Sequence, residues 1–182
     1  MFEWLKALLR RLPGRTVPPP GNNLQREHIF SNNWVRRAWL MLALLDLLWV
    51  YGVQLRWWRW RGHGVICDRY LWDTLIDFRL NFPQERVEDW LLWRLLVRAS
   101  PQPDAAFLLL VPVAESVRRS QLKDEPFPDT PEVLARRLAQ YESLAKAGHW
   151  RVLDGRRSID KLALDIRAGV EAARSASAPV PA

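Results

Sequence analysis

Cysteine is nearly absent from this sequence, because Cys67 is the only one among 182 residues. A single thiol excludes an intramolecular disulfide and a cysteine-based zinc cluster. Cys67 ends the apolar run Val65-Ile66-Cys67, so we expect a buried thiol that acts as a small hydrophobic side chain. A signal peptide is also not evident, since "MFEWLKALLRRLPG" has the pattern of an amphipathic basic helix, and we expect a cytoplasmic protein.

Glycine is scarce, and the positions of the eight glycines exclude one motif. None of them opens G-x-x-x-x-G-K-[ST], the loop whose backbone amides and lysine hold the phosphates of ATP in many nucleotide-binding proteins. Tight ATP binding through such a loop is therefore excluded for this sequence.

Acidic residues are outnumbered, with 20 Asp and Glu against 27 Lys and Arg, which gives a net charge of +7 and a pI of about 10.3. Such a charge favours anionic partners: nucleotides, nucleic acid or anionic lipid. No nucleic-acid-binding motif accompanies it, and we expect no nucleic-acid partner. The 11 tryptophans are far above average use, and most lie between residues 34 and 93.

Short apolar runs alternate with helical patterns along the chain. We expect strands over residues 64–68, 106–111 and 149–155. We expect helices over residues 1–12, 33–60 (capped by Ser31 or Asn32), 70–80, 84–98, 131–147 and 158–173, and one that follows Pro112. This alternation predicts an α/β fold, a parallel sheet with helices on both faces.

Three regions of different composition follow from the same pattern. Residues 1–33 are predicted to hold the N-terminal helix and an irregular, proline-containing loop. Residues 34–173 are predicted to form the α/β domain, and residues 174–182 a disordered tail.

One long apolar run raises the question of a membrane. Residues 38–55, "AWLMLALLDLLWVYGVQL", hold one charge, Asp46, and are flanked by Arg36-Arg37 and by "RWWRWR" at residues 56–61. A transmembrane span is near its lower length limit here, and Asp46 would cost about 2.5–3.5 kcal/mol at its centre. A peripheral contact with an anionic membrane, and a buried core helix with arginine stems over tryptophan rings, explain the same residues.

Four features, in order and spacing, resemble thymidylate kinase and its relatives among the P-loop nucleoside-monophosphate kinases. They are the strings "GVICDRY", "PQPDAAFLLLVPVAESVRRSQLKDE", "EVLARRLAQYESLAKAG" and "WRVLDGRRSIDKLALDI". The resemblance covers about residues 34–170. It implies a P-loop kinase-like fold and transfer of the γ-phosphate of ATP, with Mg²⁺, to a nucleoside monophosphate, dTMP being the family's usual acceptor.

The resemblance also assigns roles to particular residues. It implies that Asp68 positions the metal or the acceptor, that Arg69 grips the acceptor phosphate, and that Arg118, Arg119 and Lys123 are lid cations. On the same basis Tyr70, Asp46 and Asp73 lie on the substrate side, and Asp154, with Tyr141, near the nucleotide. The alternatives are a structural ion pair at Asp68-Arg69, a solvated helix face for the lid cations, and packing for the tyrosines.

The sequence departs from the family in ways that change the expectation. Besides the phosphate loop, the central strand before it and the first helix have no counterpart. Three accounts stay open: upstream residues missing before Met1, a degenerate homologue, or a partner that supplies the missing piece. We expect little or no kinase activity from this chain alone.

The acceptor is also open. Leu47 stands where the family has the arginine that reads thymine, so another phosphorylated small molecule is an alternative acceptor. A non-catalytic nucleotide- or anion-binding homologue, and a membrane-peripheral interaction protein, are the other functions left open. By analogy with the family, the long apolar helix is also compatible with a homodimer interface.

Overall fold

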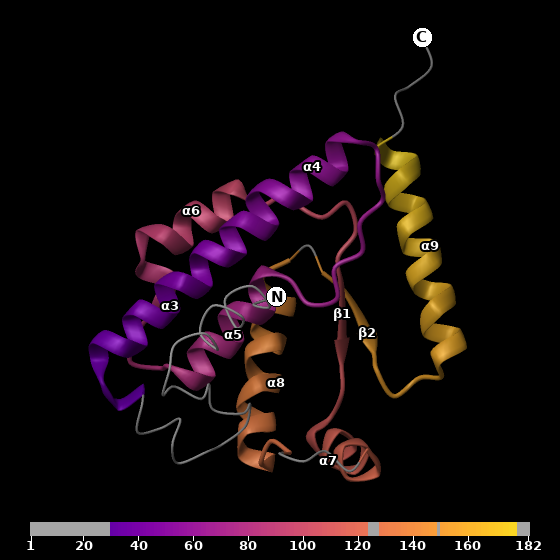
Figure 1. Ribbon diagram of the computed structural model, residues 1–182. Coiled ribbons are helices and arrows are strands. Elements are labelled where there is room, and N and C mark those ends of the chain that lie inside the picture. Colours follow the sequence, from indigo (N-terminus) through magenta and orange to yellow (C-terminus); the bar gives the residue numbers. More distant parts are fainter. Residues whose placement is uncertain (1–29, 124–127, 149, 178–182) are drawn as a thin grey trace. The chain divides into compact units, whose positions relative to one another are not determined.

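A computed structural model describes residues 30–123, 128–148 and 150–177 (Figure 1). The chain divides into two compact units, Met1–Pro101 (unit 1) and Gln102–Ala182 (unit 2), and each is described by itself. The α/β domain predicted over residues 34–173 includes parts of both units and stays a prediction. The predicted helix at residues 1–12 lies outside the described residues.

One long helical segment dominates unit 1. It consists of α3 (Asn33–Leu47), the π-helix η1 (Leu48–Gln54) and α4 (Leu55–Trp60), which follow one another without a break (Figure 1). The predicted helix is confirmed together with its cap, because the Asn32 side chain accepts a hydrogen bond of 3.0 Å from the Trp34 backbone N–H. Among the described residues this segment alone is long and apolar enough to cross a bilayer by length and composition, and 39% of its most apolar window is buried.

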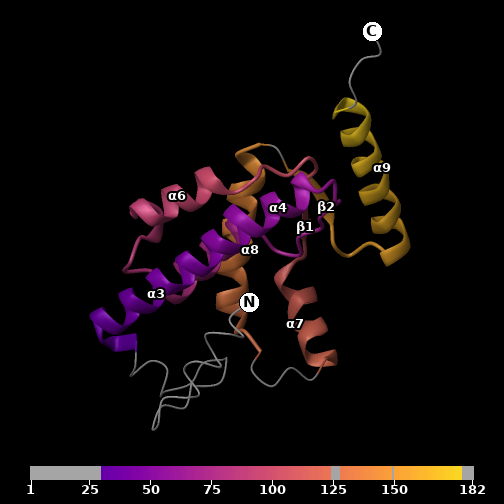
Figure 2. The same ribbon diagram turned by 45° about the horizontal axis from the view of Figure 1, so that its top comes forward.

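Two further helices pack against this segment to form the core of unit 1. They are α5 (Leu71–Asn81) and α6 (Leu91–Ala99), joined through the short 3₁₀ helix η2 (Val87–Asp89). Figures 1 and 2 both place α6 alongside α3. The largest fully buried side chains all come from these elements and η2: Leu40, Leu44, Leu47, Ile76, Leu96 and Val87.

The helix predicted over residues 84–98 begins later than expected, at Leu91. Arg86 has a φ of 37°, in the left-handed region, and Trp90 is extended, so the backbone cannot be α-helical through this stretch. The acids that suggested a helix start bind arginines instead: Glu88 pairs with Arg79. The helix predicted over residues 70–80 is confirmed as α5.

The strand predicted over residues 64–68 is wrong. Residues 63–67 form no strand, Ile66 is 98% exposed, and Cys67 is exposed rather than buried. A strand requires a neighbour to accept and donate its backbone hydrogen bonds, and no described residue pairs with this segment. A short apolar run gives the local propensity, but it does not say whether a partner strand exists.

The described residues of unit 2 form the sheet and three helices. Strands β1 (Phe107–Leu110) and β2 (Arg151–Asp154) are parallel, with Phe107 opposite Arg151 and Leu110 opposite Asp154. They confirm the predicted strands at 106–111 and 149–155, and a helix-rich chain with a parallel sheet is α/β in the coarse sense. Among the described residues the sheet has two strands, and the P-loop kinase-like arrangement with helices on both faces stays a prediction.

The helices of unit 2 are α7 (Val113–Leu122), α8 (Pro131–Lys146) and α9 (Ile159–Ser177). The Thr130 hydroxyl caps α8 by accepting from the Val133 N–H, with proline at the first helical position. Helix α9 runs past its predicted end, so residues 174–177 of the predicted disordered tail are helical. The remainder of that tail lies outside the described residues.

Candidate functional site

The Asp68-Arg69-Tyr70 turn precedes α5 in unit 1. Arg69 has a φ of 65°, a conformation that costs a non-glycine residue on the order of 1–3 kcal/mol. Its guanidinium Nη1 lies 3.3 Å from Asp73 Oδ2 and 3.8 Å from Asp77 Oδ2. The predicted phosphate-binding arginine therefore meets Asp73, a predicted substrate residue, and it does not form the structural pair with Asp68 that was the alternative.

Tyr70 has a structural role in the same turn. Its hydroxyl donates a 2.9 Å hydrogen bond to the Pro101 carbonyl, and its ring centroid is 4.6 Å from that of Tyr51. Burial raises the pKa of Tyr70, and burial raises the pKa of Tyr51 to about 12. Both phenols are neutral at physiological pH, and Tyr70 ties the turn to the segment after α6.

Asp46 lies in the interior of unit 1. It is 9% exposed, and its Oδ2 has no hydrogen-bond partner among the described residues. The predicted substrate-side role would need Asp46 to reach a surface, and the structure instead places it among buried leucines of α3 such as Leu44 and Leu47.

The second group of predicted residues gathers at one edge of the sheet in unit 2. Because β1 and β2 are parallel and end opposite each other, their carboxyl ends meet there, the usual ligand-binding edge of such sheets. Arg119 of α7 donates to Glu115 Oε1 at 2.7 Å and, from Nη2, to the Gly155 carbonyl at 2.9 Å. This arginine therefore links α7 to the turn after β2.

Arg118 uses both arms of its guanidinium on the same carboxylate. Its Nε and Nη2 each donate to a different Glu115 oxygen at 2.7 Å. The hydrogen bonds from Arg118, then those from Arg119, lower the pKa of Glu115 to about 2. Asp154 binds Arg156 in the same way, which lowers the pKa of Asp154 to about 2.

Gly155 is what allows the strand ends to approach so closely. A Cβ at this position would lie 2.5 Å from Val111 Cγ2 and 3.1 Å from the Leu110 carbonyl oxygen. The Gly155 N–H donates to that same oxygen at 2.8 Å. A larger residue would push β2 and its following turn away from β1.

Two predicted residues are peripheral to this group. Lys123 is exposed at the end of α7, four residues after Arg119 and hence on the same side of the helix. Tyr141 is half-buried in α8, as packing predicts.

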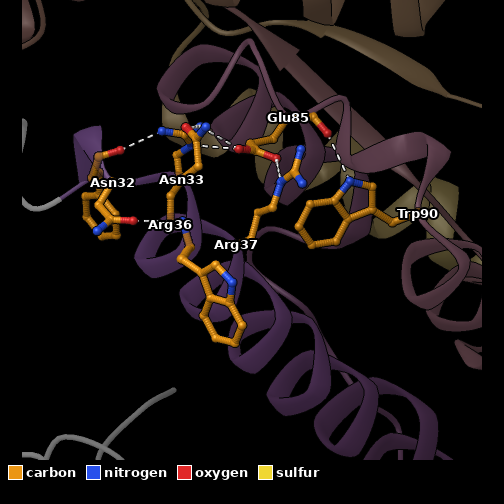
Figure 3. Close-up of polar contacts among 8 residues, drawn as sticks. Asn32, Asn33, Arg36, Arg37, Glu85 and Trp90 are labelled. Carbon is orange, nitrogen blue, oxygen red and sulfur yellow. Dashed lines mark hydrogen bonds and ion pairs between the residues drawn. The ribbon is translucent and has the colours of Figure 1, made fainter.

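One polar cluster in unit 1 was not predicted from the sequence (Figure 3). Arg36 Nε donates to Glu85 Oε1 at 2.7 Å, and Arg37 Nε donates to Glu85 Oε2 at 2.9 Å. The Glu85 side chain is 1% exposed, and its backbone carbonyl accepts from the Trp90 indole N–H at 3.0 Å. These contacts fasten the start of α3 to the α5–α6 connection.

The two arginines determine the charge state of Glu85. Burial raises the pKa of its carboxyl, but the hydrogen bonds from Arg37 and Arg36 outweigh burial and lower it. Arg36 is further held by the Phe30 carbonyl and Asn33 Oδ1 at 2.7 and 2.6 Å. Because 49 residues separate Arg36 from Glu85, no local sequence pattern could have revealed this pair.

Glu115 and Arg156 were also missed at the candidate site, and here a signal existed. Glu115 precedes Arg118 and Arg119 by three and four residues, the spacing at which helical side chains meet. Arg156 lies two residues after Asp154, the last residue of β2, and ligand-contacting residues are commonly found beyond such a strand end.

The full sequence lacks the phosphate loop that would hold ATP. Within the described part of the chain no three His, Cys, Asp or Glu side chains gather into a metal cluster, although Mg²⁺ beside a phosphate is commonly held by one or two carboxylates. Asp68, the predicted metal ligand, is exposed. No step through ATP or Mg²⁺ follows from these residues.

The predicted site residues fall into two groups. Asp46, Asp68, Arg69, Tyr70 and Asp73 belong to unit 1, and Arg118, Arg119, Lys123 and Asp154 belong to unit 2. In the first group Arg69 contacts Asp73, and in the second Arg118 and Arg119 share Glu115, which was not predicted. No protein-family model, no curated protein and no solved structure matches the chain, so its family remains a prediction.

Proposed function

We propose that this chain is the acceptor-side part of a thymidylate kinase-like phosphotransferase. In this role it binds a nucleoside monophosphate, or another phosphorylated small molecule, and has little or no kinase activity by itself. The observation that carries the proposal is the gathering of Arg118, Arg119 and Arg156 around Glu115 and Asp154 at the carboxyl edge of a parallel strand pair.

Guanidinium groups suit a phosphate ligand at this edge. Each offers a planar fork of donors that matches two phosphate oxygens. Arg118 and Arg156 are exposed, and their present partners are carboxylates, which a phosphate resembles in charge and geometry. An incoming phosphate would replace the Glu115 carboxylate as the partner of the Arg118 guanidinium.

Arg69 supports the proposal from unit 1. A left-handed backbone at a non-glycine residue persists where the surroundings enforce it, and such residues are common at ligand sites. Its exposed guanidinium, bound to Asp73 and Asp77, is a second candidate for the acceptor phosphate.

Calorimetric titration of the purified chain with dTMP, with a second nucleoside monophosphate and with ATP tests the proposal. We expect salt-sensitive binding of a monophosphate, weaker binding of ATP, and no ATP-dependent phosphoryl transfer. Robust turnover with ATP would refute the lack of activity. Absence of monophosphate binding at low salt would refute the proposal as a whole.

Variants locate the binding site. Arg118→Gln with Arg119→Gln should abolish most of the binding, because two charge-assisted contacts to phosphate are lost. Arg167→Gln with Arg174→Gln on α9 is the matched control, since it removes two exposed arginines elsewhere in unit 2. Equal losses in both variants would mean that only net charge matters.

A further inference from the structure

The outward side of the long helix in unit 1 is apolar. Between Arg37 and Arg56 every exposed residue is hydrophobic: Met41, Leu42, Leu45, Trp49 and Val53. Their spacing of three to four residues places them along one side of the helix. A surface helix of a soluble domain normally carries polar residues on its exposed side, so this side has the composition of a contact surface.

The opposite side of the same helix is already used. Leu40, Leu44 and Leu47 are buried in the core of unit 1. Asp46, the one charged residue between Arg37 and Arg56, is also turned inward and buried. The core of unit 1 is therefore formed by the other side of the helix. The exposed apolar side is a separate surface, and it carries no charge along these residues.

Helix α6 extends the apolar surface. Leu91 is 81% exposed and Leu95 is 49% exposed, and both line a groove of about 530 Å³. The groove also includes Arg37 and Met41 from α3. We call ten of the exposed apolar side chains of these helices the outer face: Trp34, Met41, Leu42, Leu45, Trp49, Val53, Trp57, Trp60, Leu91 and Leu95.

Positive charge borders the outer face, and exposed acids are missing from its helices. Arg56, Arg59 and Arg61 lie at the α4 end, where the Arg61 guanidinium stacks 4.6 Å from the Trp57 ring. Arg94 and Arg98 lie exposed on α6, which has no acidic residue. Tryptophan and arginine beside an apolar surface match the boundary between lipid headgroups and acyl chains.

We propose that the outer face docks on an anionic lipid bilayer, with the long helix lying along the membrane surface. Hydrophobic side chains enter the headgroup boundary, and the arginines bind anionic headgroups. This inference does not depend on the phosphotransferase proposal, because it uses none of the residues at the sheet edge of unit 2.

A span across the bilayer does not fit the packing of unit 1. Helices α5 and α6, which have 11 and 9 residues, pack with this segment in one core, and a span needs about 20. Insertion would also carry the Arg36–Glu85 pair into the hydrocarbon or pull the core apart.

A second copy of the chain is also a poorer occupant than lipid. Arginines border the outer face and its helices carry no exposed acid, so two such surfaces would bring like charges together in either orientation. Anionic lipid supplies the missing negative charge.

Vesicle flotation of the full chain tests the proposal. We expect the chain to float with vesicles of phosphatidylcholine and phosphatidylglycerol at low salt, to be released by high salt, and to bind phosphatidylcholine alone far less. Absence of flotation, or equal binding to both vesicle types, would overturn the proposal. Resistance to alkaline extraction would overturn it in favour of a span.

Matched variants separate the outer face from general hydrophobicity. Leu45→Gln with Trp49→Gln should remove flotation, whereas Ile159→Gln with Leu164→Gln on α9 should leave it intact, because both pairs are exposed and apolar but only the first belongs to the outer face. Far-UV circular dichroism confirms that each variant folds. If both pairs of substitutions have the same effect, the outer face is not the docking surface.

The charge component has its own test. Arg94→Gln with Arg98→Gln should weaken binding roughly fivefold per arginine, and Arg167→Gln with Arg174→Gln on α9 should not. Sedimentation equilibrium of the same samples measures self-association. If the chain does not float but forms a dimer, and Leu45→Gln with Trp49→Gln dissociates that dimer, the outer face binds a second copy and the membrane proposal is rejected.

Discussion

Unit 1 buries a cluster of large apolar side chains built from four helical segments, whereas the large apolar side chains that unit 2 buries among its described residues are Leu108 and Leu162. Helices α7 and α8 have no buried residue. Because buried apolar area is the main source of stability, unit 1 has the material for an independent core and unit 2 has much less.

Polar contacts differ between the units in the same sense. The Arg36–Glu85 pair of unit 1 is buried, with side chains 7% and 1% exposed, while the Arg118–Glu115 and Arg156–Asp154 pairs of unit 2 lie at the surface. Surface pairs contribute little each, and losing one partner of a buried pair is costly. We infer that buried interactions stabilise unit 1, whereas unit 2 depends more on surface contacts that water and salt can weaken.

The largest effect is expected from Glu85→Gln, which breaks the buried pair of unit 1. The substitution keeps the shape of the side chain but leaves Arg36 and Arg37 without their carboxylate, and we expect a loss of about 3–5 kcal/mol in the free energy of unfolding. Urea unfolding followed by tryptophan fluorescence measures this, because every tryptophan except Trp150 belongs to unit 1.

Glu142→Gln is the control for that experiment. Glu142 is exposed on α8, so its substitution should change the free energy of unfolding by less than about 0.5 kcal/mol. A cost below about 1 kcal/mol for Glu85→Gln would place its pair with the surface pairs and remove the contrast between the units.

The sequence predicted what depends on local pattern. The long helix, its Asn32 cap and α5 were recognisable from apolar spacing and capping residues, and so were β1 and β2. The run ending in Cys67 was wrongly predicted to be a strand, because an apolar run does not reveal whether a neighbouring strand pairs with it.

Long-range partners were equally out of reach at the candidate site. Arg118 and Arg119 were predicted as lid cations, but the link from Arg119 to the Gly155 carbonyl joins residues 36 apart and could not be read from a local pattern. The inward position of Asp46 depends on how three helices pack, which composition does not specify.

An intermediate effect is expected from Gly155→Ala in unit 2. The new methyl group would meet Val111 and the Leu110 carbonyl, and overpacking of this kind costs about 1–3 kcal/mol. Hydrogen exchange measured by mass spectrometry should show faster exchange in β1 and β2 and no change in α3 or α6.

Gly64→Ala in unit 1 is the matched control, since a Cβ there meets no atom within 4 Å. Its effect on the free energy of unfolding should be close to zero, or slightly stabilising because alanine lowers the conformational entropy of the unfolded chain. If Gly155→Ala speeds exchange equally in both units, they unfold together, and the stability of unit 2 is not separate from that of unit 1.

The smallest effect is the acid sensitivity of unit 2. The pKa of Glu115 falls from 4.5 to about 2 on folding and that of Asp154 from 3.8 to about 2, so both stabilise the folded state fully above their unfolded values. This stabilisation is lost as the pH falls from about 4.5 towards 2, because the folded state must then take up protons that the unfolded state already holds.

Salt separates this acid response from that of unit 1. Both groups of unit 2 lie at the surface, so 1 M salt should weaken their ion pairs and reduce the loss of stability between pH 4.5 and 2. Glu85 also has a lowered pKa, but its pair is buried and should respond to acid with little dependence on salt. The measurement is amide hydrogen exchange in α7 and β2, compared with exchange in α3, each at low and at high salt. An acid response of α3 that salt suppresses as strongly as that of α7 would mean that water reaches the Glu85 pair, and the contrast between a unit held from inside and a unit held at its surface would fail.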